Sequence, residues 1–313
     1  MKFSVIVPVY NKKPYVRKAL RSILAQSFKD FELIVVNDGS SDGSLEEMED
    51  VLSGVKNARI INQANAGVST ARNNGVAASS GEYLCFLDAD DWWEPTFLEE
   101  MAQLIEEYPE AGLYSTNYYY IKHKRAVAKL DIPTGYYNYC REYANRLCQP
   151  AWTGAVCMRK SMFDEFGGFK AHLKLGEDFD LWIRIALKYK TAFLNKPLSN
   201  YNQDVDISFR GTHHLHNPKN HMLWNLDYLK NEEKSNTDYK HLIDNLRVSG
   251  LFQYYLSNTY RQNALKELEK VDWAQQPARI WKLYHTPIWQ LKAKQAFMAC
   301  GAKIKGMILS HIR

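Results

Sequence analysis

Features that whole classes of protein require are missing from these 313 residues. No apolar run approaches the roughly 18 to 20 residues that a membrane-spanning helix needs. The five cysteines are an odd number, widely spaced and without a C-x-x-C pair, which argues against a disulfide framework and against a cysteine zinc site. Neither of the common glycine-rich phosphate loops occurs. We therefore expect reduced thiols, and any nucleotide phosphate has to be held by a metal and by basic side chains.

A secretion signal is also missing. Residues 3–10 are apolar, but they include Pro8, run into polar residues and are followed by no small-residue cleavage site, so they are typical of a buried strand. The sequence therefore predicts a cytoplasmic protein. Hydrophobic residues make up 46% of the chain and charged residues 24%, which excludes a disordered chain. The length suggests about two domains.

Positive charge is concentrated in the last part of the chain. Of 40 basic residues, seven lie beyond residue 273, where no acidic residue occurs, which leaves 33 basic against 35 acidic residues elsewhere. A nucleic-acid groove spread over the whole fold is therefore not expected. The seven basic residues are Arg279, Lys282, Lys292, Lys294, Lys303, Lys305 and Arg313. With Trp281, Trp289 and Phe297 they resemble an anchor for an anionic membrane surface, and the alternative is a tail that packs on the catalytic domain or on a second copy of the chain.

The first hundred residues alternate between the period of buried strands and that of amphipathic helices. Strands are expected at residues 3–9, 31–36, 59–62 and 82–87. Helices are expected at residues 14–26, 44–52, 69–79 and 95–108. This alternation predicts an α/β fold with a mostly parallel central sheet flanked by helices.

Beyond residue 112 the alternation is irregular. Tyrosine-rich strand pieces are expected around residues 113–120, a surface loop near 123–131 and a helix at 180–189. The segments 218–269 and 277–313 are expected to be mainly helical. The sequence therefore predicts a helical C-terminal extension.

Polar residues follow three of the predicted strands. In open α/β sheets ligands bind at the carboxyl ends of strands, so residues in these places are candidates for a site. Asp38, after the second strand, can accept hydrogen bonds from a nucleobase or a ribose. Asp-Gly and Ser-Asp sequences also form turns and helix caps without any ligand, so both interpretations of Asp38 stay open.

Asp88 and Asp90 flank Ala89 at the end of the fourth strand, where they point to the same side of an extended chain. A hard divalent cation such as Mg²⁺ or Mn²⁺, which prefers oxygen ligands, would relieve their repulsion. The alternative is that Asp90 and Asp91 cap the helix that follows.

Three further groups are candidates with plain structural alternatives. Arg72 can pair with a phosphate, with a base or with a surface carboxylate. Glu177 and Asp178 open a predicted helix, where acids favour its positive end, and they can also supply a base for an incoming hydroxyl. Four histidines could include a metal ligand, although flexible His-rich stretches are usually solvated. They are His213, His214, His216 and His221.

Joined in order, the segments FSVIVPVYN, ELIVVNDGSSDGS, NAGVSTARNNG, EYLCFLDADDWWEP, GGF and GEDFDLWIR resemble the family-two glycosyltransferases, inverting enzymes with the type-A glycosyltransferase fold. The resemblance covers about residues 1–210. It implies a nucleotide-diphosphate-sugar donor, with UDP favoured, and Mn²⁺ or Mg²⁺. We predict a catalytic domain at 1–215, with a nucleotide-binding half at 1–110 and an acceptor-side half at 111–215, followed by a helical region at 216–313.

The resemblance also implies residue roles. The residues that it assigns to the donor are Pro8, Val9, Tyr10, Asn11, Asp38, Arg72, Asp88, Ala89 and Asp90. Asp88 and Asp90 would form the D-x-D element, with Asp90 on the metal, and Asp178 would be the general base. The segment after Tyr201 departs from the family's commoner Tyr-Arg form, so a late histidine on the metal stays an open question.

The sequence thus predicts an inverting glycosyltransferase that acts on a glycan or lipid-linked glycan by a single displacement. Trp152 and Glu177 are acceptor-side candidates, and Trp152 fits a core aromatic equally well. A nucleotidyltransferase would need a basic loop that Lys12 and Lys13 alone do not provide. The non-enzymatic alternative is a subunit that binds a sugar nucleotide or scaffolds glycan assembly without turnover. A peripheral place on the cytoplasmic face of a membrane and a homo-oligomer are further expectations.

Overall fold

The computed structural model describes residues 2–146, 148–205 and 215–293. Two compact units are present, Met1–Asn231 and Glu232–Arg313. The assignment of residues 1–215 to catalysis stays a prediction, because a compact unit is defined by contacts and not by function.

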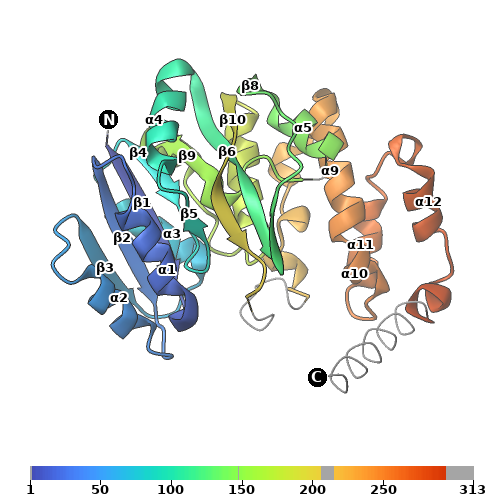
Figure 1. Ribbon diagram of the computed structural model, residues 1–313. Coiled ribbons are helices and arrows are strands. Elements are labelled where there is room, and N and C mark those ends of the chain that lie inside the picture. The colour runs from blue at the N-terminus through green and yellow to red at the C-terminus, as the bar shows by residue number, and fades with distance from the viewer. Residues whose placement is uncertain (1, 147, 206–214, 294–313) are drawn as a thin grey trace. The chain divides into compact units, whose positions relative to one another are not determined.

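Four parallel strands form the N-terminal half of a mixed sheet in the first unit (Figure 1). They lie in the order β3-β2-β1-β4, with the bounds β1 Phe3–Val9, β2 Phe31–Asp38, β3 Ala58–Gln63 and β4 Tyr83–Phe86. All residues of β1, β2 and β4 are buried, as in strands covered on both faces. The predicted alternation is confirmed for this half, and the carboxyl ends of its strands meet at one edge.

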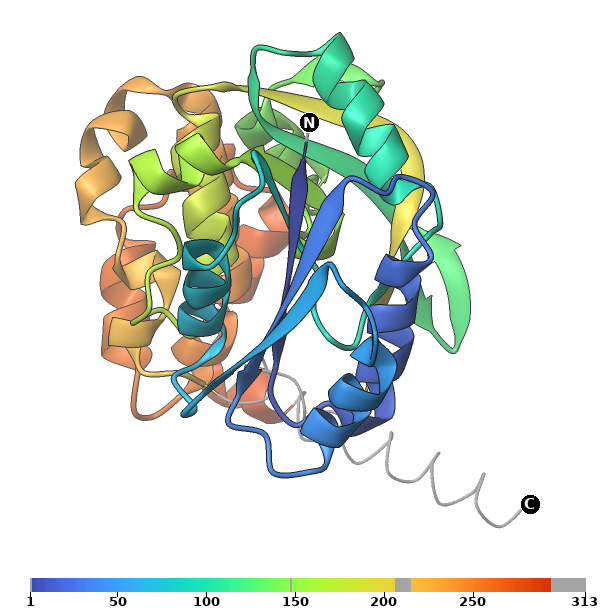
Figure 2. The same cartoon turned by 90° about the vertical axis from the view of Figure 1, so that its left-hand side faces the viewer.

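Helices cover both faces of this half. α1 Lys13–Leu24 and α2 Ser44–Leu52 lie on one face, and α3 Val68–Ala77 lies on the other (Figure 2). α3 approaches β1 so closely that a Cβ on Gly75 would lie 2.6 Å from Cγ2 of Ile6, so only glycine fits there. This close packing holds α3, and with it Arg72, against the sheet.

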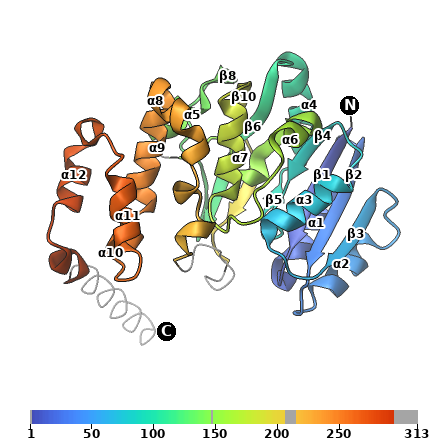
Figure 3. The same ribbon diagram turned by 180° about the vertical axis from the view of Figure 1, so that it is seen from behind.

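The second half of the sheet mixes antiparallel and parallel pairs. Its strands are β5 Trp92–Trp93, β6 Ala111–Lys122, β7 Lys124–Val127, β8 Gly135–Tyr137, β9 Val156–Arg159 and β10 Lys190–Asn202. β9 runs antiparallel to β4 and to β6, whereas β10 runs parallel to β6. Its helices are α4 Phe97–Glu107, α5 Tyr139–Arg146, α6 Lys160–Phe166 and α7 Glu177–Ala186. Figure 3 shows α3, α6 and α7 along one face of the sheet.

One expectation is wrong between residues 123 and 131, where the sequence predicts a surface loop. Lys124–Val127 form β7, which pairs antiparallel with the end of β6. His123 makes the turn between them at a positive φ of 59°. All four residues of β7 are exposed, so the segment lacks the alternation of apolar and polar residues from which a strand is predicted.

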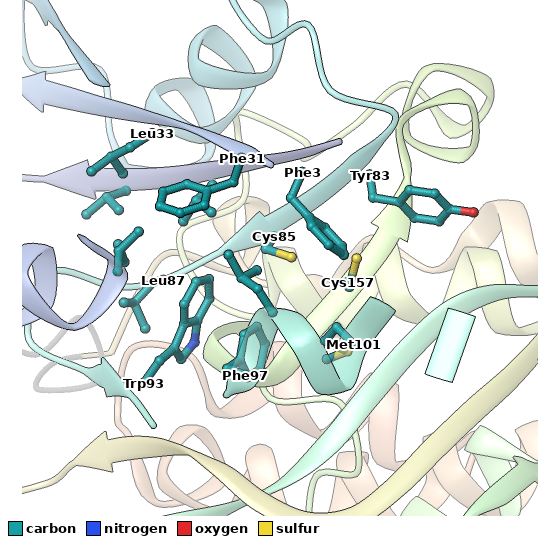
Figure 4. Close-up of a cluster of buried hydrophobic side chains, with 14 of the residues drawn as sticks. Phe3, Phe31, Leu33, Tyr83, Cys85, Leu87, Trp93, Phe97, Met101 and Cys157 are labelled. Carbon is teal, nitrogen blue, oxygen red and sulfur yellow. The ribbon is translucent and has the colours of Figure 1, made fainter. Parts of the chain in front are cut away.

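A buried cluster joins strands of both halves to α1 and α4 (Figure 4). Trp93 stacks on Phe97 with ring centroids 4.1 Å apart, and its indole Nε1 donates to the carbonyl oxygen of Gly154 at 2.6 Å. Cys85 and Cys157 oppose each other in the β4–β9 pair, and none of the four cysteines in the described ranges is in a disulfide. Dense packing of this kind gives the sheet edge a rigid base.

The second unit is helical, as expected for the part of it that is described. Its helices are α9 Thr237–Gly250, α10 Phe252–Leu256, α11 Arg261–Leu268 and α12 Ala278–Tyr284, and α8 Lys230–Ser235 spans the boundary between the units. Short 3₁₀ turns occur along the chain at Thr153–Ala155, Pro218–Asn220, Met222–Trp224, Asp227–Leu229 and Trp273–Gln275. Within residues 2–146, 148–205 and 215–293, every helix is too short or too polar to span a bilayer.

Candidate functional site

The turn after β1 is hydrogen-bonded to the turn after β2. Asn11 adopts a positive φ of 51°, and its Oδ1 accepts the backbone N–H of Ser41 at 2.8 Å. The N–H of Asn11 donates to Ser40 Oγ at 3.1 Å. The N–H of Lys12 donates to Ser44 Oγ at 2.8 Å. The two turns therefore form one rigid platform at this edge of the sheet.

The predicted donor residues next to this platform differ in exposure. Pro8 and Val9 are buried as the last residues of β1, and Ala89 is buried after β4. A ligand at this edge can therefore reach these three residues mainly through their backbone. Tyr10, in contrast, is 49% exposed, so its ring is available to a ligand.

Asp38 ends β2 and is buried. Its Oδ1 accepts from Gln63 Nε2 and from the N–H of Ala66, both at 2.8 Å, and its Oδ2 accepts from the N–H of Gly67 at 2.9 Å. These bonds tie the end of β2 to the loop that leads into α3. A carboxylate has about four acceptor positions, so about one remains for a ligand.

Arg72 lies on α3 and is almost completely buried between two acids. Its Nη2 donates to Asp88 Oδ1 at 2.7 Å, and its Nη1 donates to Glu177 Oε1 at 3.0 Å. Burial alone would lower the pKa of Arg72, but Asp88, Glu177 and Asp178 together raise it above its usual value. Arg72 is therefore a permanent positive charge that joins α3, the end of β4 and the start of α7.

Asp90 pairs with the second positively charged side chain at this edge, which is that of Lys12. Its Oδ2 lies 2.5 Å from Nζ of Lys12, and both side chains are partly buried. Burial raises the pKa of Asp90, and the negative charge of Asp88 raises it further, whereas Lys12 lowers it. Asp88 and Asp90 therefore interact electrostatically, as the D-x-D spacing predicts.

Asp91 is buried and does not cap the following helix through any contact that the structure shows. It accepts the backbone N–H of Asn202 at 2.8 Å and the indole Nε1 of Trp152 at 3.3 Å. Burial and the charges of Asp90 and Asp88 raise its pKa well above the usual value. Asp91 thus links the end of β4 to β10 and to Trp152.

Glu177 and Asp178 begin α7, after Gly176 at a positive φ of 80°. Asp178 Oδ2 accepts from Thr153 Oγ1 at 2.8 Å, and its Oδ1 accepts the N–H of Phe179 at 2.8 Å. Burial and the neighbouring Asp178 raise the pKa of Glu177 to about 7, although Arg72 lowers it. The two acids thus have different partners: Glu177 accepts from the guanidinium of Arg72, and Asp178 accepts from the hydroxyl of Thr153.

Negative charge exceeds positive charge at this edge. The described acids that act on one another or share Arg72 are Asp88, Asp90, Asp91, Glu177 and Asp178. Against these five, the ion pairs among the described residues supply two bases, Lys12 and Arg72. An excess of buried carboxylates is relieved by protonation or by a bound cation, so the site is suited to a positively charged ligand.

Asp88 and Asp90 fit a divalent cation in their chemistry, because both offer hard oxygen ligands at one strand end. No group of three acidic, histidine or cysteine side chains in the described ranges is arranged to hold a metal. Mg²⁺ is often bound by one or two carboxylates together with substrate phosphates. The pair therefore suits a cation that binds together with a diphosphate.

The histidine candidates divide into two groups. His213 and His214 lie outside the described residues. His221 is buried, and its Nδ1 accepts the N–H of Leu223 at 3.1 Å. Burial and the nearby His216 lower the pKa of His221 to about 4. His221 therefore serves as a cap for a short turn.

Trp152 directly precedes the 3₁₀ turn Thr153–Ala155 that leads into β9, and its acceptor-side role stays a prediction. Its ring packs on Tyr201 with centroids 3.9 Å apart, and Tyr120 lies 5.7 Å from Tyr201. Trp152 and Tyr201 are only partly buried and lie against a small core cluster. The adjacent residue Thr153 contacts Asp178, so these aromatic rings stand close to the predicted base.

Three contacts of the candidate site are not predicted from the sequence. They are the pair of Lys12 with Asp90, the hydrogen bond from Thr153 to Asp178 and the bond from Trp152 to Asp91. The position of Lys12 directly after the first strand is the one signal that could have drawn attention to it. Nothing around Thr153 in the sequence indicates a role.

The basic side chains and the two tryptophans in the described part of the tail are exposed, whereas Tyr284 is buried and its hydroxyl donates to the carbonyl oxygen of Val248 at 2.7 Å. Trp281 is 47% exposed and Trp289 is 70% exposed, and Trp281 stacks on His285 at 3.9 Å. Arg279, Lys282 and Lys292 are exposed as well. Phe297 and the later basic residues lie outside the described residues.

Comparisons with known proteins bear on this edge of the sheet. A family model described as glycosyl transferase family 2 matches residues 4–167. Glycosyltransferase GlyA of Streptococcus pneumoniae is 35% identical over 212 residues, 64% of this chain but only 30% of that protein. The amylovoran biosynthesis glycosyltransferase AmsB of Erwinia amylovora is 28% identical over 240 residues, 73% of this chain and 77% of that protein. This chain thus spans less than a third of the length of GlyA.

Solved structures show the same fold. S. aureus TarS in complex with UDP-GlcNAc gives a TM-score of 0.71 at 20% identity, over 90% of this chain and 84% of that chain. The mannosyltransferase PcManGT from Pyrobaculum calidifontis, in complex with GDP-Man and Mn²⁺, gives 0.58 at 16% identity, over 96% and 80%. At these identities the likeness concerns the fold, and it confirms the predicted architecture.

Proposed function

The chain belongs to glycosyl transferase family 2, and on this premise we propose that it is an inverting glycosyltransferase. Its donor is a nucleotide-diphosphate sugar, with UDP favoured, and its acceptor is a hydroxyl of a glycan or lipid-linked glycan. The observation that carries the proposal is that Arg72 donates to Asp88 at 2.7 Å and to Glu177, the neighbour of Asp178, at 3.0 Å, which brings these acids to one sheet edge. The UDP and UDP-GlcNAc complexes of TarS and the amylovoran role in the name of AmsB support the donor and acceptor classes.

Asp178 is the general base in this proposal. Thr153 and the N–H of Phe179 each donate to one of its oxygens, so the carboxylate is held in one orientation. The acceptor oxygen bonds to the anomeric carbon of the sugar while its proton passes to Asp178 and the bond to the diphosphate oxygen breaks. Attack from the face opposite the leaving group inverts the anomeric centre without a covalent enzyme intermediate.

Asp38, the backbone of Pro8 and Val9, and the ring of Tyr10 hold the nucleoside. Asp88 and Asp90 would hold Mn²⁺ or Mg²⁺, which supplies positive charge next to the departing diphosphate. Arg72 fixes one oxygen of Asp88 at 2.7 Å and so sets the direction of the other. Arg72 also adds a permanent positive charge to the side of the site that receives the nucleotide.

The acceptor binds on the other side of Asp178, against Trp152 and Tyr201. Aromatic rings pack well against the apolar faces of sugars, and their polar edges accept or donate hydrogen bonds. Glu177, which accepts a hydrogen bond from Arg72 and precedes Asp178 at the start of α7, belongs to this acceptor side in the proposal. The exposed Trp281, Trp289 and basic residues of the tail bind an anionic membrane surface in this proposal, which would bring a lipid-linked acceptor to the site.

The test uses the full chain with a panel of UDP-Glc, UDP-Gal, UDP-GlcNAc and GDP-Man in the presence of Mn²⁺. Release of nucleoside diphosphate should depend on the metal and favour one UDP-sugar. Asp178→Asn should lower this release about 10³-fold, because the acceptor proton then has no base. Calorimetry should show UDP affinity within about twofold of wild type, since the substitution keeps the shape of the side chain.

Asp164→Asn is the matched control, because Asp164 is an exposed acid on α6, and it should leave turnover unchanged. Turnover that persists in Asp178→Asn would contradict the role of Asp178. A wild-type protein that binds UDP-sugar tightly but releases no nucleotide with any metal would favour the non-catalytic sugar-nucleotide-binding subunit instead.

A further inference from the structure

Lys12 occupies a position that the proposed reaction leaves unexplained. Its backbone belongs to the rigid platform, because its N–H donates to Ser44 Oγ at 2.8 Å. Its side chain crosses from the end of β1 to the end of β4 and places Nζ 2.5 Å from Asp90 Oδ2. The side chains of Lys12 and Asp90 are 16% and 18% exposed, so water screens the pair only in part.

The two acids of the D-x-D element thus have separate positive partners. Arg72 on α3 pairs with Asp88 and also with Glu177 at the start of α7, and its side chain is only 3% exposed, so its charge is buried. Lys12 is different, because a lysine is a point charge on a flexible stem with three rotatable donors. Its Nζ can therefore leave Asp90 without movement of the backbone, which the hydrogen bonds of the platform hold in place.

An ammonium group and a divalent cation compete for the same carboxylate oxygens of Asp90. A cation that binds alone has to displace the partly buried ammonium of Lys12 from the Asp90 carboxylate and offers it no new anion in exchange. A diphosphate that arrives with the cation offers the displaced ammonium new anionic oxygens at the same sheet edge. By reciprocity, the cation and the nucleotide should each strengthen the binding of the other.

We propose that Lys12 is an internal counter-cation of the donor site: it pairs with Asp90 while the site is empty and moves to the donor's diphosphate when a divalent cation takes Asp90. The inference rests on the proposed function, because it requires a diphosphate donor and a metal at this edge. It adds that Lys12 weakens binding of the metal alone and strengthens binding of the metal and nucleotide together.

The test measures binding rather than turnover. Free Mn²⁺ is followed by electron paramagnetic resonance in the nucleotide-free protein, and UDP is titrated by calorimetry with and without Mn²⁺. In Lys12→Met, which keeps the length of the side chain but removes its charge, Mn²⁺ alone should bind about tenfold more tightly. UDP in the presence of Mn²⁺ should bind about tenfold more weakly. The mutual strengthening of Mn²⁺ and UDP should shrink accordingly.

Two variants control for structure and for charge. Lys13→Met removes the charge of the neighbouring exposed lysine and should leave both affinities within about twofold of wild type. Lys12→Arg keeps the positive charge and should retain the weak binding of Mn²⁺ alone. Circular dichroism and thermal denaturation establish that each variant is folded.

The outcomes separate this inference from the proposed function. Wild type that binds UDP with Mn²⁺, together with a folded Lys12→Met that binds Mn²⁺ alone no more tightly than wild type, would overturn the role of Lys12 only. Loss of Mn²⁺ and UDP binding together in Lys12→Met would also overturn it, since a merely structural lysine predicts that result. Wild type that binds no Mn²⁺ even with UDP would overturn the metal part of the proposed function and this inference with it.

Discussion

Two buried arginines, one in each unit, pair with the same kind of partner, a glutamate, but the pKa values of the two glutamates shift in opposite directions. Arg72 in the first unit is 3% exposed and pairs with Glu177, whose side chain is 13% exposed. Arg247 in the second unit is 1% exposed and pairs with Glu233, whose side chain is 16% exposed. Burial and Asp178 raise the pKa of Glu177 to about 7 despite Arg72. Burial alone would raise the pKa of Glu233 as well, but Arg247 holds it below the usual value.

The difference lies in the balance of charge around each arginine. The network around Arg247 contains the acids Glu233, Asp244 and Glu267 and the bases Arg247, Lys240 and Lys270. Each acid there has at least one cation of its own, which makes the network self-sufficient. The edge around Arg72 has five interacting acids and two paired bases. Matched charge indicates structure, and unmatched charge indicates a place for a ligand.

Replacement of each arginine should give the largest effects and tests whether the two clusters differ in function. Arg72→Met and Arg247→Met should each lower the free energy of unfolding by about 3–5 kcal/mol, because each removes a buried cation that two or more acids share. UDP affinity should fall only in Arg72→Met. Thermal denaturation and calorimetric titration of UDP check the two effects. Equal loss of UDP affinity in both variants would show that charge balance does not distinguish a ligand site from a structural network. Arg72→Lys and Arg247→Lys serve as controls that retain the positive charge.

A smaller effect is expected when one acid of each cluster is replaced by an amide. The melting temperature should then change in opposite directions in the two clusters. Glu177→Gln removes charge from the edge with too many acids and should raise the melting temperature by about 2–4 °C, equivalent to about 1 kcal/mol. Glu233→Gln removes one side of a matched pair and should lower it by a similar amount. Differential scanning calorimetry of both variants measures the two changes in melting temperature. The same sign of change in the two variants would refute the distinction.

The smallest effect is the pH dependence of the unliganded protein. Because Glu177 titrates near 7 when folded and lower when unfolded, the folded protein binds more protons between these values. Stability should therefore fall as the pH rises from about 5 to about 7. Glu233 has a lowered pKa, so its contribution is present above its usual range and is lost as the pH falls. Melting curves of wild type and Glu177→Gln from pH 4 to 8 should differ mainly by this slope, and identical slopes would argue against a raised pKa.

Much of the fold could be predicted because local patterns determine it. The period of the apolar residues predicts β1, α1, β2 and α2 within a few residues, since each element buries a continuous face. The strand β7 could not be predicted, because its four residues are exposed and are held by pairing with β6. The antiparallel insertion of β9 between β4 and β6 also depends on contacts far apart in sequence.

The site could be predicted in part, for a related reason. Asp38, Asp88 and Asp90 follow strands, and parallel strands bring their carboxyl ends together. The partners of these acids come from distant segments, such as Lys12, which is 78 residues from Asp90. Thr153 is 25 residues from Asp178 and lies on a short 3₁₀ turn without a recognisable pattern. Chemistry can thus be located from the sequence, whereas the contacts that tune it cannot.

The turn that carries Trp152 and Thr153 touches two parts of the site at once. Trp152 donates to Asp91, next to the acids that follow β4, and Thr153 donates to Asp178. A backbone shift in this turn would therefore disturb both halves of the chemistry together. Under the proposed function, variation of this turn for a new acceptor should also alter the choice of donor sugar, so libraries built on this turn need to be selected for both substrates simultaneously.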